Sequence, residues 1–254
     1  LHTTASFTID ANRGIDMTGS GAMNVDASTT LTYNGVLAGA GGIFTKNGGG
    51  KLVLGGTNTF TRSTHIDAGT LSIGSDANLG AATGFATSGT LALSGASSAY
   101  YGDLAISAGR VQASNSNALG YSGSSYYSTV TVASNAWLEL SGGITIGYYK
   151  FFYLSGTGSA SGGVLISTGG SNTLQGPIYL QAATRINSST GSTLTLDIPD
   201  GYGANSISNT YNLTLGGAGD LVINDPIAIG SATLTKDGSG RATLAGTNTY
   251  SGAT

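Results

Sequence analysis

Short stretches of the chain alternate apolar residues with small polar ones, and Gly, Asn or Ser bounds most of them. Clear examples are "TLSI" from Thr70, "TLAL" from Thr90, "TVTV" from Thr129 and "TLTLDI" from Thr193. An alternation with a period of two predicts strands that bury one face. No segment repeats apolar residues at the three- and four-residue spacing of an amphipathic helix. We therefore expect an all-β chain.

These strands recur at a fixed interval along the chain. The stretches "AGTLSI" from Ala68, "SGTLAL" from Ser88 and "AGRVQA" from Ala108 begin twenty residues apart. Three short strands and three tight turns use about that length, which is one coil of a three-faced parallel β-helix. The competing fold, a β-sandwich, favours hairpin turns such as Asn-Gly. That dipeptide begins only at Asn34 and Asn47, so the spacing favours the solenoid.

Composition supports this interpretation and narrows the function. The chain has 254 residues, of which 43 are glycine and only 8% are charged. Glycine suits sharp corners that need a positive φ. The net charge is −3 and no basic run occurs, so nucleic acid is not an expected partner. No apolar run is long enough for a membrane span, and the chain does not begin with a recognisable signal peptide.

One phrase occurs twice, as "TKNGGGKLVLGGTNTF" (45–60) and "TKDGSGRATLAGTNTY" (235–250). It resembles the passenger-associated transport repeat of bacterial autotransporters, with motifs expected at 45–74 and 235–254. We expect a structural role for the motif residues, with the two asparagines at equivalent corners. The motif residues are Lys46, Gly48, Gly50, Asn58 and Phe60 in the first copy and Lys236, Gly238, Gly240, Asn248 and Tyr250 in the second.

The resemblance implies a right-handed β-helix that is carried across the outer membrane of a Gram-negative bacterium. Residues 1–254 would then be a single β-helix segment of a longer passenger, located at the cell surface or secreted. The passenger would meet the membrane only through a barrel domain that is absent from this chain. The expected function is a non-catalytic stalk that supports outward transport and display, in adhesion or in contact between cells.

The chain offers no clear catalytic, metal-binding or cofactor-binding group. Its two histidines are His2 and His65, and its carboxylates are scattered, with Asp197 and Asp200 a close pair. No nucleophile lies in a recognisable setting, so we expect no enzyme. The open alternatives are a carbohydrate-binding or carbohydrate-active β-helix, which would need converging carboxylates for catalysis, and the non-catalytic part of a secreted protease.

Aromatic residues are the most distinctive candidates for binding. Tyr pairs recur at intervals close to one coil, and Trp137 should point outward from a strand whose Leu138 and Leu140 point inward. Stacked coils would align such rings into a surface for a host or bacterial glycan or protein, or for a second copy of the chain. Alternatively, the rings cover a side of the helix. The candidate residues are Tyr100, Tyr101, Tyr126, Tyr127, Trp137, Tyr148 and Tyr149.

Overall fold

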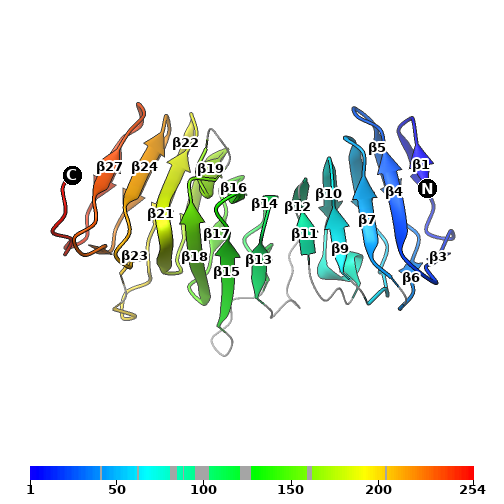
Figure 1. Cartoon of the computed structure of the whole chain (residues 1–254), viewed down its shortest axis with the longest axis horizontal. Helices are drawn as coiled ribbons and strands as arrows, with labels where there is room; N and C mark the ends of the chain where they lie inside the picture. Colours follow the sequence, from blue (N-terminus) through cyan, green and yellow to red (C-terminus); the bar gives the residue numbers. More distant parts are fainter. Residues whose placement is uncertain are drawn as a thin grey trace.

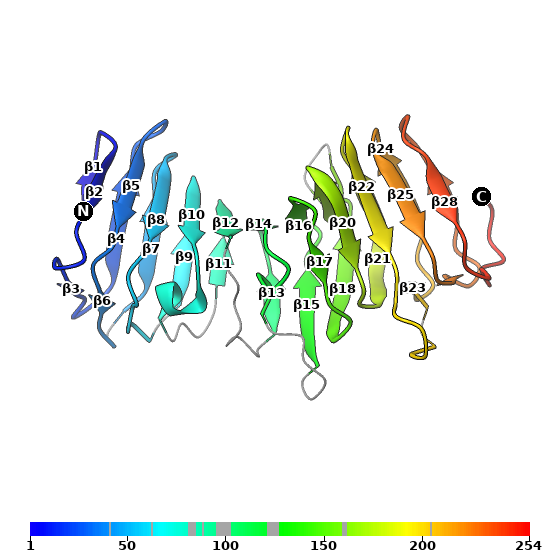
Figure 2. The ribbon, with the colours of Figure 1, turned by 180° about the vertical axis from the view of Figure 1, so that it is seen from behind.

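The computed structural model describes residues 1–40, 42–61, 63–80, 85–87, 89–94, 103–120, 127–158, 162–203 and 205–254. Within this part of the chain, strands dominate, and the helical element is one 3-10 turn, η1 (Asp76–Leu79). The strands stack side by side into an elongated body with the two termini at opposite ends (Figures 1 and 2). The predicted all-β class is confirmed.

Each coil visits up to three faces in turn, and all the strand pairs described are parallel. Strands of the first face are β1 (His2–Thr3), β4 (Gly21–Val25), β7 (Phe44–Asn47), β9 (Thr64–Ile66), β11 (Phe85–Thr87), β13 (Leu104–Ile106), β15 (Ser128–Val132), β18 (Lys150–Gly156), β23 (Ile207–Ser208) and β26 (Ile227–Ala228). The sheet that ends at β11 leads into the next one because β11 contacts β13.

The second face is the longest sheet and runs through most of the molecule. Its strands are β2 (Phe7–Ile9), β5 (Thr30–Tyr33), β8 (Lys51–Leu54), β10 (Thr70–Ile73), β12 (Thr90–Leu93), β14 (Gly109–Ala113), β16 (Ala136–Ser141), β19 (Leu165–Thr168), β24 (Leu213–Gly217) and β27 (Leu234–Lys236). The long strand β21 (Ile178–Ser188) belongs to both faces, because its first part pairs with β18 and its second part with β19.

The third face is interrupted. Its strands are β3 (Ile15–Asp16), β6 (Leu37–Ala38), β17 (Thr145–Ile146), β20 (Gly170–Leu174), β22 (Ser192–Leu196), β25 (Asp220–Ile223) and β28 (Ala242–Leu244). Between β6 and β17 the chain covers this side with loops and η1 in the described residues. The arrangement is the parallel β-helix expected from the coil spacing.

The twenty-residue spacing appears directly in the strand register. Leu71 pairs with Leu91, and Leu91 with Val111, on β10, β12 and β14. All three side chains are buried, as are Ile73 and Leu93 in the next inward row. Burying a Leu or Ile side chain stabilises a fold by about 1.5–3 kcal/mol, so this column of aliphatic residues is the main source of cohesion between coils.

Candidate functional site

The lysine of the first motif copy, Lys46, stabilises a corner of its coil from the inside. Lys46 is completely buried on β7. Its Nζ donates hydrogen bonds to the carbonyl oxygens of Asn47 and Gly48, both at 2.7 Å, and of Ala68 at 3.2 Å. Ala68 lies one coil further along the chain. The ammonium group therefore ties the corner of its own coil to the corner of the next one.

The second copy repeats this geometry. Lys236 Nζ donates to the carbonyl oxygens of Asp237, at 2.5 Å, and of Gly238, at 3.2 Å. Lys236 is exposed, whereas Lys46 is buried beneath a following coil. Burial lowers the pKa of Lys46 to about 8, because removal from water disfavours the charged form.

The two motif asparagines also occupy equivalent positions. Asn58 Oδ1 accepts a hydrogen bond of 2.8 Å from the backbone N–H of Leu37, and Asn248 Oδ1 accepts one of 2.9 Å from that of Ile227. Each acceptor thus bonds to the coil before it. Asn58 Nδ2 also donates to the carbonyl oxygen of Asn78 in the coil after it. The side chain therefore links three successive coils.

The motif glycines allow close contact between neighbouring coils. Gly48 and Gly238 have φ of +77° and +72°. A Cβ atom at Gly50 or Gly240 would lie 2.2 Å from Asp26 O or 1.9 Å from Gly219 O, respectively. In both copies the backbone of one coil lies where a side chain would have to be, so these positions exclude any residue larger than glycine.

The motif aromatics fill the interior to different degrees. Phe60 is completely buried, and its ring centre lies 5.7 Å from that of Phe44. Tyr250, its counterpart, is half-buried and packs against the core. Both rings therefore belong to the interior of their coils.

The two motif copies occupy different faces of the helix. In the first copy, the lysine strand β7 lies on the first face and β8 on the second. In the second copy, the lysine strand β27 lies on the second face and β28 on the third. The motif is thus rotated by one face about the helix axis. Because its corner bonds are the same in both places, the motif is a local unit that closes one coil wherever it falls.

A second feature, on the first face of the helix, is a connected set of aromatic rings that we call the aromatic surface. Neighbouring ring centres in it are 3.9–6.5 Å apart. Tyr127 and Tyr149 precede the paired strands β15 and β18, which puts them one coil apart. The members of the aromatic surface are Tyr127, Tyr148, Tyr149, Phe151, Tyr153, Tyr179 and Tyr202.

The hydroxyl groups of this surface are also linked. The Tyr149 and Tyr202 hydroxyls are 3.0 Å apart and share a hydrogen bond. This bond, followed by burial, raises the pKa of Tyr149 to about 12, and burial together with neighbouring phenols raises the pKa of Tyr148. Both phenols are therefore neutral at physiological pH. Tyr127 is 59% exposed and Tyr202 46% exposed, whereas the other five rings are half-buried.

The structure brings together only some of the aromatic residues singled out in the sequence. Tyr127, Tyr148 and Tyr149 lie in one network, and Tyr100, Tyr101 and Tyr126 lie outside the described residues. Trp137 is half-buried on β16, beside Arg110, between the buried residues Ala136 and Leu138. It belongs to the second face and, among the described residues, stands apart from the ring network.

Some members of the aromatic surface were not among the predicted candidates. Phe151, Tyr153 and Tyr179 point outward because strand alternation turns Phe152, Leu154 and Ile178 into the core. The alternation in "KFFYL" and "IYL" carries that signal. Tyr202 comes from the loop after β22, and nothing in the local sequence indicates that it reaches Tyr148, 3.9 Å away between ring centres.

Several carboxylates accept hydrogen bonds from backbone N–H groups or from polar and basic side chains. Asp220 Oδ1 accepts from the Arg241 N–H at 3.0 Å, and Asp225 Oδ2 from that of Ile198 at 2.6 Å. Glu139 accepts from Arg110 Nη1, Gln112 Nε2 and Thr168 Oγ1 on the outer side of the second face. Among the described residues, no three His, Cys, Asp or Glu side chains gather in a group that could hold a metal ion.

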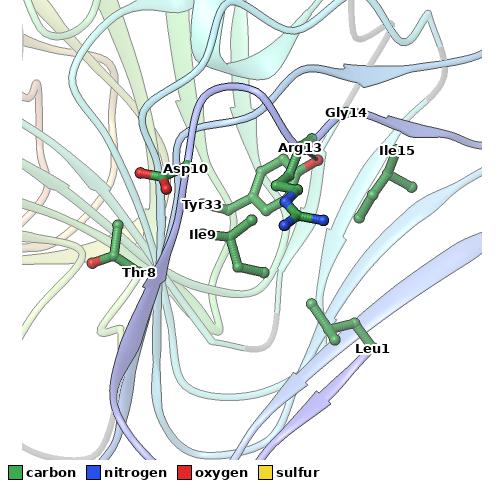
Figure 3. A pocket seen from close by; sticks show the side chains of 8 residues that line it. All are labelled: Leu1, Thr8, Ile9, Asp10, Arg13, Gly14, Ile15 and Tyr33. Atoms are coloured by element: carbon green, nitrogen blue, oxygen red, sulfur yellow. Dashed lines mark hydrogen bonds between the residues drawn. The ribbon is translucent and has the colours of Figure 1, made fainter.

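A hollow of about 480 Å³ opens at the N-terminal end of the core. Figure 3 shows the side chains that line it, among them Ile9, Ile15, Tyr33 and Arg13. The Tyr33 hydroxyl donates to the Arg13 carbonyl oxygen at 2.5 Å. The lining of the hollow combines apolar side chains of the first coils with the exposed residues Thr8, Asp10 and Arg13, and we assign no chemistry to it.

Comparison with known proteins agrees with the repeated motif. The family model described as "Passenger-associated-transport-repeat" matches residues 44–73, 88–113 and 234–254. The middle match covers β12 to β14, so a third copy of the repeat lies between the two predicted at 45–74 and 235–254. The matched residues make up less than a third of the chain.

The chain is also similar to "Adhesin BmaC autotransporter" of Brucella suis biovar 1 (strain 1330). The identity is 42% over 74 residues, which is 29% of this chain and 2% of that protein. The chain therefore spans only a small part of this curated relative. No solved structure matches it. In the described part, no helix is long and apolar enough to cross a membrane. The chain therefore contains passenger-associated transport repeats and is similar, over part of its length, to an autotransporter adhesin, and both findings support a location at the cell surface or in the secreted fraction.

Proposed function

We propose that the chain is a non-catalytic stalk whose repeat motifs support outward transport by locking coils as they form. The observation that carries this proposal is the pair of inter-coil ties made by one motif copy. Lys46 bonds to Ala68 in the following coil, and Asn58 bonds to Leu37 in the preceding coil. A coil that contains the motif is thus fixed to both neighbours by buried polar groups.

Such ties suit a chain that folds one coil at a time. Each coil of a solenoid contacts only its neighbours, so folding propagates along the axis. A buried donor or acceptor that loses its partner costs about 1–3 kcal/mol, so a motif coil resists opening once its bonds are made. Folding outside the membrane then opposes backward movement of the chain and favours its exit.

The elongated shape supports a role in display. The stack of parallel coils separates the termini to opposite ends (Figure 2). A continuous aliphatic core from Val25 to Leu234 makes the body stiff. Surface display in turn suits adhesion to a host or bacterial glycan or protein, or association with a second copy. The name of the similar Brucella adhesin favours adhesion over the remaining alternatives, a carbohydrate-active enzyme or the stalk of a secreted protease.

Transport is tested in the passenger expressed with its own translocation machinery in a Gram-negative cell. The double variant Lys46→Met and Asn58→Ala should lower the fraction of passenger that external protease reaches on intact cells, at equal synthesis. Lys51→Met is the matched control, because Lys51 is exposed on the adjacent strand β8. Equal surface exposure of both variants and the natural chain would refute a role for the motif in transport.

The non-catalytic assignment has its own test. The purified chain is incubated with neutral and acidic polysaccharides, and released reducing ends are measured. No release is expected. Release that disappears on replacement of Asp197 or Asp200 would instead establish the carbohydrate-active alternative.

A further inference from the structure

We propose that the aromatic surface on the first face binds an uncharged polysaccharide, an inference that rests on the display role proposed above. The surface spans three neighbouring strands, β15, β18 and the first part of β21, and the Tyr202 loop borders it. Its rings come from separate coils of a rigid scaffold, so the surface exists before any ligand arrives.

The outward side chains of these strands are uncharged, and the charges at the borders of the surface are negative, because Asp103 Oδ1 accepts from the Thr129 N–H at 2.7 Å and Asp200 is exposed two residues before Tyr202. The side chains that point outward from β15, β18 and the first part of β21 are Thr129, Thr131, Phe151, Tyr153 and Tyr179. Lys150 of β18 points inward, where its Nζ donates to Ser128 Oγ at 2.5 Å. A charged ligand would find no opposite charge on the strand side chains to offset the water that it loses, and that loss is costly. An acidic ligand would in addition be repelled by Asp103 and Asp200.

The surface also requires hydroxyl groups on its ligand. Tyr127, Tyr149 and Tyr202 present phenol groups beside their rings, and the phenols of Tyr148 and Tyr149 stay protonated at physiological pH. Tyrosine combines a rigid apolar ring with a polar end. A purely apolar ligand would add no hydrogen bond to the one that Tyr149 and Tyr202 already share, whereas a sugar offers apolar ring faces and hydroxyl groups together.

The size of the open area favours a sugar over a protein. Only Tyr127 and Tyr202 of the seven rings are exposed by more than about two fifths, because the others cover one another. Stable protein–protein interfaces bury about 1,200–2,000 Å², which exceeds what such partly covered rings provide. Neighbouring strands lie about 4.8 Å apart, so Tyr153 and Tyr179 recur at a spacing close to one hexose of an extended chain. The two rings are stacked with centres 5.3 Å apart.

The probes are dextran and laminarin as neutral glucans, and alginate as an acidic one, titrated calorimetrically into the purified chain. The natural chain should bind at least one neutral glucan and not alginate. Tyr127→Ala with Tyr202→Ala should weaken that binding at least tenfold, and Tyr149→Phe, which removes one hydroxyl, should weaken it less. Tyr211→Ala is the control, because Tyr211 is 43% exposed and lies outside the ring network. Tyr127→Ala alone serves if the double variant does not fold.

Several outcomes would overturn the inference. These are a lack of binding to either neutral glucan, a preference for alginate, equal binding by the Tyr127 and Tyr211 variants, or a dimer that the Tyr127→Ala variant abolishes. The outcome is separable from that of the stalk proposal, because the tyrosine variants keep Lys46 and Asn58 and should reach the cell surface normally. Normal display without glucan binding refutes only the ligand assignment.

Discussion

Asn58 and Asn78, on adjacent coils, are interlocked through their side-chain amides. Asn58 Nδ2 donates to the backbone carbonyl of Asn78, and Asn78 Nδ2 donates to the carbonyl of Gly56 at 2.9 Å. Both asparagines are buried. Asn78 Oδ1 also accepts from the N–H groups of Gly74 and Ser75. The pair therefore fixes a corner of one coil directly onto the next.

Replacing Asn58 with Ala should destabilise the chain by about 2–4 kcal/mol, because two buried backbone groups, Leu37 N–H and Asn78 C=O, lose their partner. Asn248→Ala removes one bond at a half-buried site and should cost about 1 kcal/mol. Urea denaturation followed by circular dichroism measures both values. Equal losses in the two variants would contradict the importance of contact with the following coil.

Lys46→Met should destabilise the chain by about 1–3 kcal/mol at neutral pH, because the methionine fills similar space but leaves three carbonyl oxygens without a donor. Lys51→Met, at an exposed position on β8, should change stability by less than about 0.5 kcal/mol. The midpoint of urea unfolding distinguishes the two. A neutral or stabilising effect of Lys46→Met would show that the free-energy cost of burying the ammonium group equals or exceeds the stabilisation from its hydrogen bonds.

Lys46 also gives the stability a defined dependence on pH. Its pKa is about 8 in the folded chain, against 10.5 for an ordinary lysine, so the unfolded chain binds more protons between these values. The free energy of unfolding should therefore rise with pH across that window. Relative to Lys46→Met, the natural chain should gain about 1–2 kcal/mol between pH 7.5 and 9.5. If the free energies of unfolding of the two proteins depend on pH in the same way, the pKa of Lys46 is not lowered by folding.

Glu139→Gln should destabilise the second face by about 1–3 kcal/mol, because Arg110 and Gln112 both donate to this buried carboxylate, at 3.0 and 2.8 Å. The new amide would direct a donor toward one of these donors. Asp16→Asn, at an exposed site, is the matched change of charge and should be nearly neutral. Thermal unfolding of the two variants at the same pH is the measurement. Matching midpoints would mean that the Glu139 bonds contribute nothing net.

The coil architecture was predictable because its signal is local and periodic. Leu71, Leu91 and Val111 recur every twenty residues, and the same residues pair in register. The alternation around Trp137 also predicted that Leu138 and Leu140 lie inside, and both are buried. Such positions follow from strand geometry alone.

The aromatic surface was only partly predictable because it depends on coil lengths. Leu138 and its partner Leu165 are 27 residues apart, and Ile186 and its partner Leu215 are 29 apart, so the sequence does not reveal which loop residue faces which strand. Tyr202 meets Tyr149 across two coils for this reason. The buried Asn172, which bonds to Gly143, Ile144 and Leu140, was missed as well. Its phrase "SNTL" resembles the "TNT" of the two motif asparagines, which is the signal that could have found it.

Glycine substitutions can separate the cost of a left-handed corner from the cost of contact between coils. Gly48 has φ of +77°, and a Cβ there would lie 2.3 Å from Val25 O. Gly142 has φ of +95° with open space around it, and Gly19 has open space without a positive φ. Replacement by Ala should cost more than about 3 kcal/mol at Gly48, about 1–2 kcal/mol at Gly142 and almost nothing at Gly19.

The differences in the free energy of unfolding then have separate meanings. The stability lost in Gly142→Ala minus that lost in Gly19→Ala gives the strain of the left-handed backbone. The stability lost in Gly48→Ala minus that lost in Gly142→Ala gives the cost of the steric clash with the preceding coil. If Gly48→Ala and Gly142→Ala lose the same amount, the close approach of coils at the motif is not what excludes a side chain. If Gly48→Ala loses more stability than Gly142→Ala, the motif glycine is required because the preceding coil occupies the position of its side chain. The same close approach of coils lets the Lys46 ammonium group bond to the corners of two coils.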